Sequence, residues 1–141
     1  MAKLIETPTK KIDDYSQIIG EETIERIKEK SEKLKDKEII HINSTSYGGG
    51  VAEILRNLVS LLNDLNIKNE WFVLEGSDIF FNVTKKIHNA LQGNKEIRLT
   101  EEMIEIYLKN NKKNLENLDL DKDFIIVHDP HSRIHTKKFR F

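Results

Sequence analysis

The stretch IIHINSTSYGGGVAEILRNLVSLLNDL, residues 39–65, decides the fold of this chain. Residues 39–42 are apolar except for His41 and predict a short buried strand, whereas residues 43–50 are polar or glycine and predict a turn. In residues 51–65 the apolar side chains recur with the period of a helix, so we expect one face of that helix to be buried. This face comprises Val51, Ile54, Leu55, Leu58, Val59, Leu62 and Leu65. A strand, a glycine-rich turn and a helix form the unit with which α/β proteins hold anionic ligands.

Three consecutive glycines, Gly48, Gly49 and Gly50, remove every Cβ where the backbone would approach a ligand. A Walker-type loop would continue with Lys and then Ser or Thr, but this sequence continues Val-Ala. A dinucleotide-binding fingerprint needs Gly or Ala where Glu53 stands, although Glu75 falls where a ribose-binding acid is expected. The pattern therefore favours a phosphate or sugar site over an NAD site, with a plain tight turn as the structural alternative.

The composition excludes several classes of protein. A chain of 141 residues is long enough for one domain with a core. Its 23 Lys and Arg residues against 24 Asp and Glu residues give a net charge of -1, so nothing overall indicates nucleic-acid or membrane partners. The absence of cysteine excludes disulfides and thiolate metal sites, and the first residues contain no apolar signal segment. We expect a soluble cytoplasmic protein.

The rest of the chain continues the alternation of helices and strands. Apolar runs at residues 71–74 and 124–127 predict two further strands, and the continuous run at 71–74 is typical of a strand covered on both faces. Amphipathic helices are predicted over residues 21–35 and 80–91, and a third helix begins at the Thr100 cap. The third helix is expected to bury Ile104, Tyr107, Leu108, Leu115 and Leu118.

This order predicts an α/β fold, a partial Rossmann-like three-layer domain with a parallel sheet and right-handed crossovers. We divide the chain into an N-terminal segment with an amphipathic helix (1–37), the Rossmann-like part (38–130) and a basic tail (131–141). If strand 39–42 is central, the loops after it and after strand 124–127 flank a crevice in which ligands of open α/β sheets bind.

Polar residues at the end of the last strand allow several interpretations. His128 and Asp129 suit a sugar-hydroxyl site, a general acid or base, or half of a metal site, but they equally suit a cap for the turn at Pro130. The residues alone favour the cap, because no third ligand has metal-site spacing. His41 is expected to be a hydrogen-bonded core residue, and His88 either packs or lines a pocket.

Three segments together resemble a known family. They are HINSTSYGGGVAEIL (41–55), FFNVTKKIHNALQG (80–93) and FIIVHDP (124–130), and they are similar to the N-terminal region of trehalose glycosyltransferring synthases. That family comprises retaining glycosyltransferases of family 4 with the GT-B fold. The resemblance implies transfer of glucose from a nucleotide sugar, such as UDP- or ADP-glucose, to a glucose acceptor without a metal ion.

The resemblance also implies roles for individual residues. The glycine turn and the acid that follows it would hold the phosphate or sugar of the donor: Gly48, Gly49, Gly50 and Glu53. The second segment would line the acceptor pocket with Lys85, His88 and Asn89. The strand-end motif would supply two catalytic-site ligands of sugar hydroxyls, His128 and Asp129, with His128 closest to the reacting carbon.

The chain also departs from the family pattern. It ends soon after Pro130, with a tail HSRIHTKKFRF that is rich in Lys and Arg and does not resemble the family's continuation. We therefore expect the donor-binding half to be missing and the isolated chain to be incompetent. The last strand would be an open edge, able to pair with a complementary C-terminal domain chain or with a second copy. The alternatives are a non-catalytic sugar- or nucleotide-binding module and, less favoured, a dinucleotide-binding unit; the tail is interpreted as a solvated terminus rather than a nucleic-acid arm.

Overall fold

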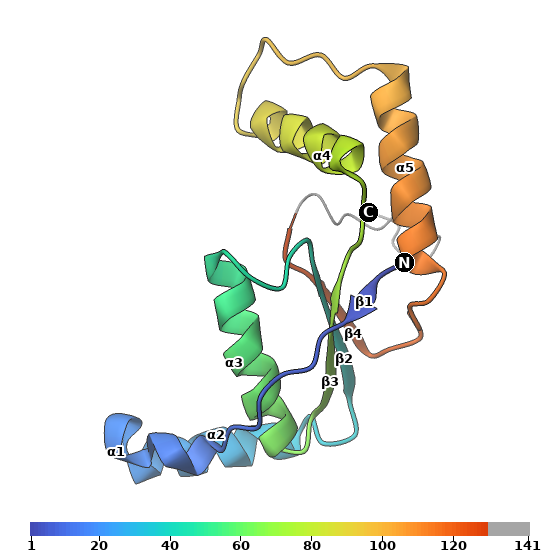
Figure 1. The fold of residues 1–141 in the computed structure, drawn as a ribbon. Coiled ribbons are helices and arrows are strands. Elements are labelled where there is room, and N and C mark those ends of the chain that lie inside the picture. Colours follow the sequence, from blue (N-terminus) through green and yellow to red (C-terminus); the bar gives the residue numbers. More distant parts are fainter. Residues whose placement is uncertain (130–141) are drawn as a thin grey trace.

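The computed structural model describes residues 1–129; the basic tail lies outside the described residues. Its centre is one four-stranded sheet with the strand order β1-β3-β2-β4 (Figure 1). The strands are β1 (Lys3–Leu4), β2 (Glu38–Asn43), β3 (Lys68–Val73) and β4 (Phe124–Val127). Strands β3, β2 and β4 are parallel, and β1 pairs antiparallel with β3. The α/β fold with a central β2 is confirmed; the sheet is mixed rather than purely parallel because the N-terminal residues add β1.

Helix α3 lies along one face of this sheet, and the other helices lie mainly at its two ends (Figure 1). They are η1 (Ile12–Tyr15), α1 (Ser16–Ile19), α2 (Glu21–Glu32), α3 (Gly50–Asp64), α4 (Asp78–Leu91) and α5 (Glu101–Leu115). Helix α2 crosses the amino ends of the strands, whereas α4 and most of α5 lie beyond their carboxyl ends. The predicted Thr100 cap is confirmed, because its hydroxyl accepts a hydrogen bond from the Met103 N–H at 3.3 Å.

The core consists of two layers, one on each face of the sheet. On one face α3 packs its buried side chains against β3, and this layer contains Ala52, Leu55, Val59 and Trp71. On the other face the end of α5 and the segment after it cover the strands, and this layer contains Ala2, Ile40, Ile42, Leu74 and Leu118. Alternate residues of β2 and β3 thus enter opposite layers, as the period of a strand requires.

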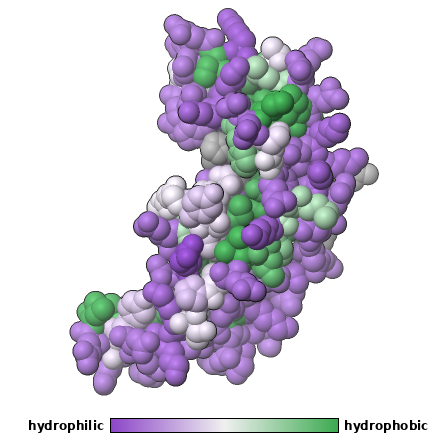
Figure 2. Space-filling model, viewed as in Figure 1, coloured by the Kyte–Doolittle hydropathy of each residue, from purple (hydrophilic) through white to green (hydrophobic). Residues whose placement is uncertain are grey.

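Two helices bury a narrower face than their sequences predict. On α3 the side chains of Ile54 and Leu58 are 63% and 37% exposed, and on α5 those of Ile104 and Leu108 are 46% and 47% exposed. The predicted burial of these four is wrong, because nothing among residues 1–129 covers that side of either helix. Figure 2 shows apolar areas over the sheet and over the α4–α5 part, between hydrophilic surroundings.

Strand β4 forms an edge of the sheet and pairs with β2 alone among the described residues. Phe124, Ile126 and Val127 are 46%, 41% and 36% exposed, so this edge presents apolar side chains together with unpaired backbone groups. The predicted open edge is confirmed for residues 1–129. In the same residues no helix combines the length and the apolar composition that spanning a membrane requires.

Candidate functional site

The loop before the glycine turn is joined directly to the residues that follow β4. Both the backbone N–H and the hydroxyl of Ser44 donate to Oδ2 of Asp129, each at 2.8 Å. One residue earlier, the N–H of His128 donates to the carbonyl of Ile42 at 2.9 Å and extends the pairing of β4 with β2. The turn after β2 and the His128–Asp129 corner therefore lie at the same edge of the sheet. We call these contacts the Ser44–Asp129 junction.

A buried amide supports this junction from below. Asn43, the last residue of β2, is fully buried, and its Oδ1 accepts a hydrogen bond from Nε1 of Trp71 at 2.7 Å. Its Nδ2 donates to the carbonyl of Thr45 at 2.6 Å. Both ends of the amide are thus satisfied, as burial requires, and the first residues of the turn are fixed in position relative to β3.

Two histidines form a hydrogen-bonded pair beside the junction. Nδ1 of His41, on β2, lies 3.1 Å from Nε2 of His128, with the ring planes 23° apart. Burial, and then repulsion from His128, lowers the pKa of His41 to about 4. Burial also lowers the pKa of His128, although the charge of Asp129 opposes that shift. Both rings are therefore neutral near pH 7 and share one N–H···N bond. His41, which the sequence predicts only as a core residue, thus orients His128.

The glycine turn itself is exposed and opens into α3. Gly48 has φ of +70°, in the left-handed region that favours glycine. Helix α3 begins at Gly50, and Gly49 at its N-cap has no side chain that caps the first N–H groups. These groups and the helix dipole give the turn a partial positive charge. Glu53 lies in the first turn of the same helix and is exposed to solvent.

The three predicted acceptor residues lie on a different element. Lys85, His88 and Asn89 belong to α4, which packs against α5 and lies beyond the carboxyl ends of the strands (Figure 1). Lys85 and Asn89 are exposed and His88 is half-buried. Among the described residues, no hydrogen bond or ion pair joins the side chain of Lys85 or Asn89 to the Ser44–Asp129 junction. The structure thus places Ser44, at the start of the turn, beside His128 and Asp129, whereas the three predicted acceptor residues lie on a separate element.

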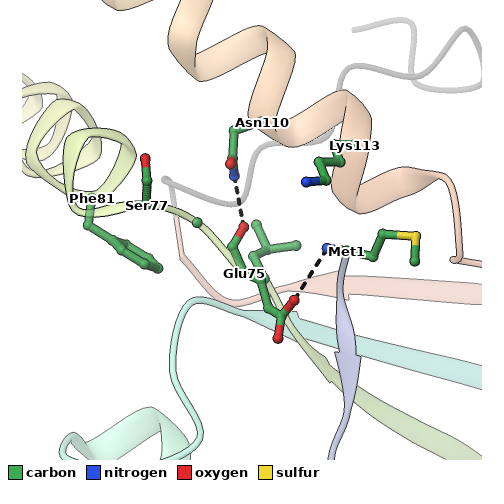
Figure 3. Close-up of a pocket in the computed structure, with 8 residues that line it drawn as sticks. Met1, Glu75, Ser77, Phe81, Asn110 and Lys113 are labelled. Atoms are coloured by element: carbon green, nitrogen blue, oxygen red, sulfur yellow. Dashed lines mark hydrogen bonds and ion pairs between the residues drawn. The ribbon is translucent and has the colours of Figure 1, made fainter.

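A cavity of about 550 Å³ lies beyond the carboxyl end of β3, and we call it the Glu75 cavity (Figure 3). Its lining comes from the N-terminus, the β3–α4 turn, α4 and α5: Met1, Leu74, Glu75, Gly76, Ser77, Phe81, Asn110 and Lys113. Among these residues, only Glu75 is a candidate binding residue from the sequence. The spacing of Asn110 and Asn114, which places two amides on one face of α5, is the signal in the sequence that marks this region.

Comparison with known proteins identifies the family. Residues 41–140 match the family described as "Trehalose synthase, N-terminal domain". The chain belongs to this family. The match includes residues 131–140, so the expectation that this part of the tail departs from the family is wrong.

Individual relatives agree with the family match. The chain is 61% identical over 122 residues to the trehalose synthase of Thermococcus litoralis, covering 86% of this chain and 30% of the relative. It is 42% identical over 124 residues to the trehalose synthase of Rubrobacter xylanophilus, with the same two coverages of 86% and 30%. It is 33% identical over 95 residues to the trehalose phosphorylase of Grifola frondosa, covering 64% of this chain and 13% of the relative. The chain comes from an enzyme lineage and spans about 30% of the length of these synthases.

Proposed function

We propose that this chain is the acceptor-side part of a trehalose-forming glycosyltransferase with the GT-B fold. It takes part in transferring glucose from a nucleotide sugar, such as UDP- or ADP-glucose, to a second glucose with retention of configuration. The reaction takes place in the cytoplasm and requires no metal ion. The observation that carries the proposal is the Ser44–Asp129 junction, because it joins the glycine turn to the His128–Asp129 corner in a chain of the trehalose synthase family.

The donor side of the site consists of the glycine turn and the start of α3. Bare N–H groups from Gly48 to Gly50 are suited to bind diphosphate or sugar oxygens, and they stabilise the negative charge that develops on a leaving nucleotide. Glu53, one turn along the helix, accepts a hydrogen bond from a donor hydroxyl. The backbone of the turn is held in place before the donor binds, because the Ser44–Asp129 junction and the Asn43 amide fix the start of the turn.

His128 and Asp129 contact the transferred sugar in this proposal. Oδ2 of Asp129 is occupied by Ser44, whereas Oδ1 has no partner among residues 1–129 and accepts a hydrogen bond from a sugar hydroxyl. The Nε2 atom of His128 is occupied by His41, so its Nδ1 faces the ligand. A neutral imidazole held in one orientation suits a hydroxyl ligand better than a charged one. Lys85, His88 and Asn89 line the acceptor side of the cleft.

We also propose that the chain needs a complementary domain to turn over. It spans about 30% of its trehalose synthase relatives, and β4 presents an open apolar edge at which further structure can pair. A domain that binds the nucleotide would complete the cleft from the opposite side. The isolated chain is then expected to bind glucose or nucleotide weakly and to form no trehalose.

The test is a titration of the ¹⁵N-labelled chain with glucose, UDP and ADP, followed by heteronuclear NMR. We expect shifts at the amides of Ser44–Gly50 and at Asp129, and we expect Asp129→Asn to weaken glucose binding while Asp36→Asn, at an exposed turn, leaves it unchanged. The absence of shifts in Ser44–Gly50 and Asp129 with all three ligands would contradict the proposal. Detectable trehalose from the chain alone would contradict the need for a complementary domain.

The open edge of β4 favours a second candidate, a sugar- or nucleotide-binding module that acts by pairing with another chain. Light scattering separates the two, because a module that works by pairing through β4 associates at micromolar concentration and loses association on Ile126→Lys. The dinucleotide-binding alternative, motivated by the glycines and Glu75, requires that NAD bind more tightly than glucose, UDP or ADP in calorimetry.

A further inference from the structure

The turn at the end of β3 is held by buried amides from α5. Oδ1 of Asn114 accepts the N–H of Glu75 at 2.9 Å, and Nδ2 of Asn114 donates to the Glu75 carbonyl at 2.7 Å. Asn110 donates to the same carbonyl at 2.9 Å. Asn114 is 1% exposed, so a buried amide fixes both backbone groups of one surface residue. Such support from neighbouring side chains is what holds a binding group in a defined place.

The residues that follow Glu75 are equally constrained. Gly76 packs so closely on the ring of Phe80 that any Cβ would collide with it. The hydroxyl of Ser77 caps α4 by accepting the N–H of Phe80 at 3.3 Å. The turn therefore presents the Glu75 carboxylate on a backbone that cannot easily rearrange.

The wall of the Glu75 cavity combines acceptors, donors and an aromatic ring. The carboxylate of Glu75 is 60% exposed, and its ion pair with the Met1 amine at 3.3 Å uses only Oε2. Lys113 has no ion-pair partner among residues 1–129. The Phe81 ring, about a third exposed, packs edge to face on Phe80 with the centroids 5.3 Å apart. Figure 3 shows Phe81 on the α4 side and Asn110 and Lys113 on the α5 side of the same space.

We propose that the Glu75 cavity binds a neutral sugar through its hydroxyl groups. Each hydroxyl both donates and accepts, so a sugar suits a lining that includes a free carboxylate oxygen, an ammonium group and a hydroxyl. The exposed face of Phe81 offers apolar contact to the C–H face of a sugar ring. The lining carries charges of both signs, the Glu75 carboxylate against the Lys113 ammonium and the Met1 amine; a neutral ligand leaves this arrangement undisturbed, whereas an anion would have to lie beside the Glu75 carboxylate. The volume of about 550 Å³ lies within the range of small-ligand sites.

The choice of glucose as the sugar rests on the proposed function, whereas the class of ligand rests on the lining of the cavity. In the full reaction this cavity would hold the acceptor glucose, with Phe81 of α4 in its wall. The Ser44–Asp129 junction and the Glu75 cavity follow neighbouring strands, since β2 and β3 are paired. Their carboxyl ends therefore meet at one edge of the sheet.

The experiment is the glucose titration by NMR, read at the cavity and carried out on matched variants. We expect glucose to shift the amides of Glu75, Ser77 and Phe81. Glu75→Gln should weaken binding about tenfold, because hydrogen bonds to a carboxylate are among the strong ones. Lys113→Ala should weaken it about threefold, whereas Lys112→Ala on the same helix, outside the cavity, should leave it unchanged.

Each result decides the proposal. Shifts at the cavity that Glu75→Gln weakens and Lys112→Ala does not would support it. Glucose shifts confined to Ser44–Gly50 and Asp129 would overturn the cavity site and leave the proposed function intact. Shifts at neither place would contradict both. Tighter binding of inorganic phosphate than of glucose at the cavity would overturn the assignment to a neutral sugar. Unfolding curves in urea establish that Glu75→Gln folds, since its backbone clamp does not use the carboxylate.

Discussion

The turns that follow β2 and β3 are both held by hydrogen bonds from a distant side chain, but the side chain differs in its chemistry. After β2, the carboxylate of Asp129 receives the N–H and the hydroxyl of Ser44. After β3, the amide of Asn114 both accepts from and donates to the backbone of Glu75. In each case a side chain from a segment far along the chain fixes the first residue of a turn. The remaining polar groups of that turn stay available at the carboxyl edge of the sheet.

The difference between the two turns is one of charge and burial. Asn114 is 1% exposed and neutral, so its hydrogen bonds should be insensitive to pH. Asp129 is half-buried and lies beside the His41–His128 pair, whose rings take up protons as the pH falls. The turn after β3 is therefore expected to be the more stable one, and the turn after β2 the one that responds to pH.

The largest expected effect is on the turn after β3. Asn114→Ala removes three hydrogen bonds, two to Glu75 and one to the carbonyl of Asn110, and should lower the free energy of unfolding by about 3 kcal/mol. Urea denaturation followed by circular dichroism measures this value. The control is Asn117→Ala, which loses a single bond to the Ala2 carbonyl and should cost about 1 kcal/mol. Equal losses of unfolding free energy in the two variants would show that Asn114 stabilises the chain no more than Asn117 does.

The next effect concerns the dependence of stability on pH. His41 titrates near its ordinary pKa of 6.5 when unfolded and at about 4 when folded. The folded chain therefore binds fewer protons between these values, so the stabilisation is complete above pH 6.5 and is lost as the pH falls toward 4. The loss should be about 2 to 3 kcal/mol.

His41→Asn isolates this contribution, because asparagine keeps a polar group near the position of Nδ1 but does not titrate. The unfolding free energy should fall between about pH 7.5 and about pH 4.5 in both proteins. We expect this fall to be smaller in the variant by about 2 to 3 kcal/mol. The carboxylates titrate in both proteins and cancel in the comparison. An unchanged difference would mean that His41 is not held neutral by the fold.

A smaller loss is expected at the turn after β2. Asp129→Ala removes both hydrogen bonds to Ser44, and the half-exposed position lets water replace part of them, so the cost should be about 1 to 2 kcal/mol. Amide hydrogen exchange should show faster exchange at Ser44 and unchanged exchange at Glu75. Faster exchange at both would show that the two turns are not independent.

The sequence predicts the sheet well where the strands are apolar and poorly where they are polar. The strand predicted at 124–127 is confirmed as β4, but β3 begins at Lys68, three residues before the apolar run at 71–74. Asn69 explains the difference: it is buried, and its amide donates to the Val59 carbonyl at 3.2 Å and to the Asn63 side chain at 2.7 Å. A polar residue whose partners come from a helix has no signature in the local pattern.

The same limit applies to the candidate site. Parallel strands place their carboxyl ends at one edge, so the closeness of the turn after β2 to His128 and Asp129 follows from the order of the elements. The contacts within the site do not. The pairs His41–His128 and Ser44–Asp129 join residues more than eighty positions apart, and they depend on the register of β2 with β4. Register is set by packing across the whole sheet and cannot be deduced from either strand alone.

The smallest effects on stability distinguish a plain turn from a ligand-binding turn. Gly48 has φ of +70°, so Gly48→Ala should cost about 1 kcal/mol. A Cβ at Gly50 would meet nothing within 4 Å. Because Gly50 begins α3, Gly50→Ala should be neutral or stabilising by up to about 1 kcal/mol.

Glycine at position 50 is therefore not required by the fold of the free chain. If Gly50 lacks a side chain so that a phosphate can come close to the backbone, Gly50→Ala should weaken the binding of UDP or ADP about tenfold. The unfolding curve in urea should stay the same or shift to higher urea. NMR titration measures the affinity. Unchanged affinity would leave the glycines as components of a turn and would remove the donor side from the proposed site. The Ser44–Asp129 junction would then support a sugar site alone, because that contact does not depend on the glycines.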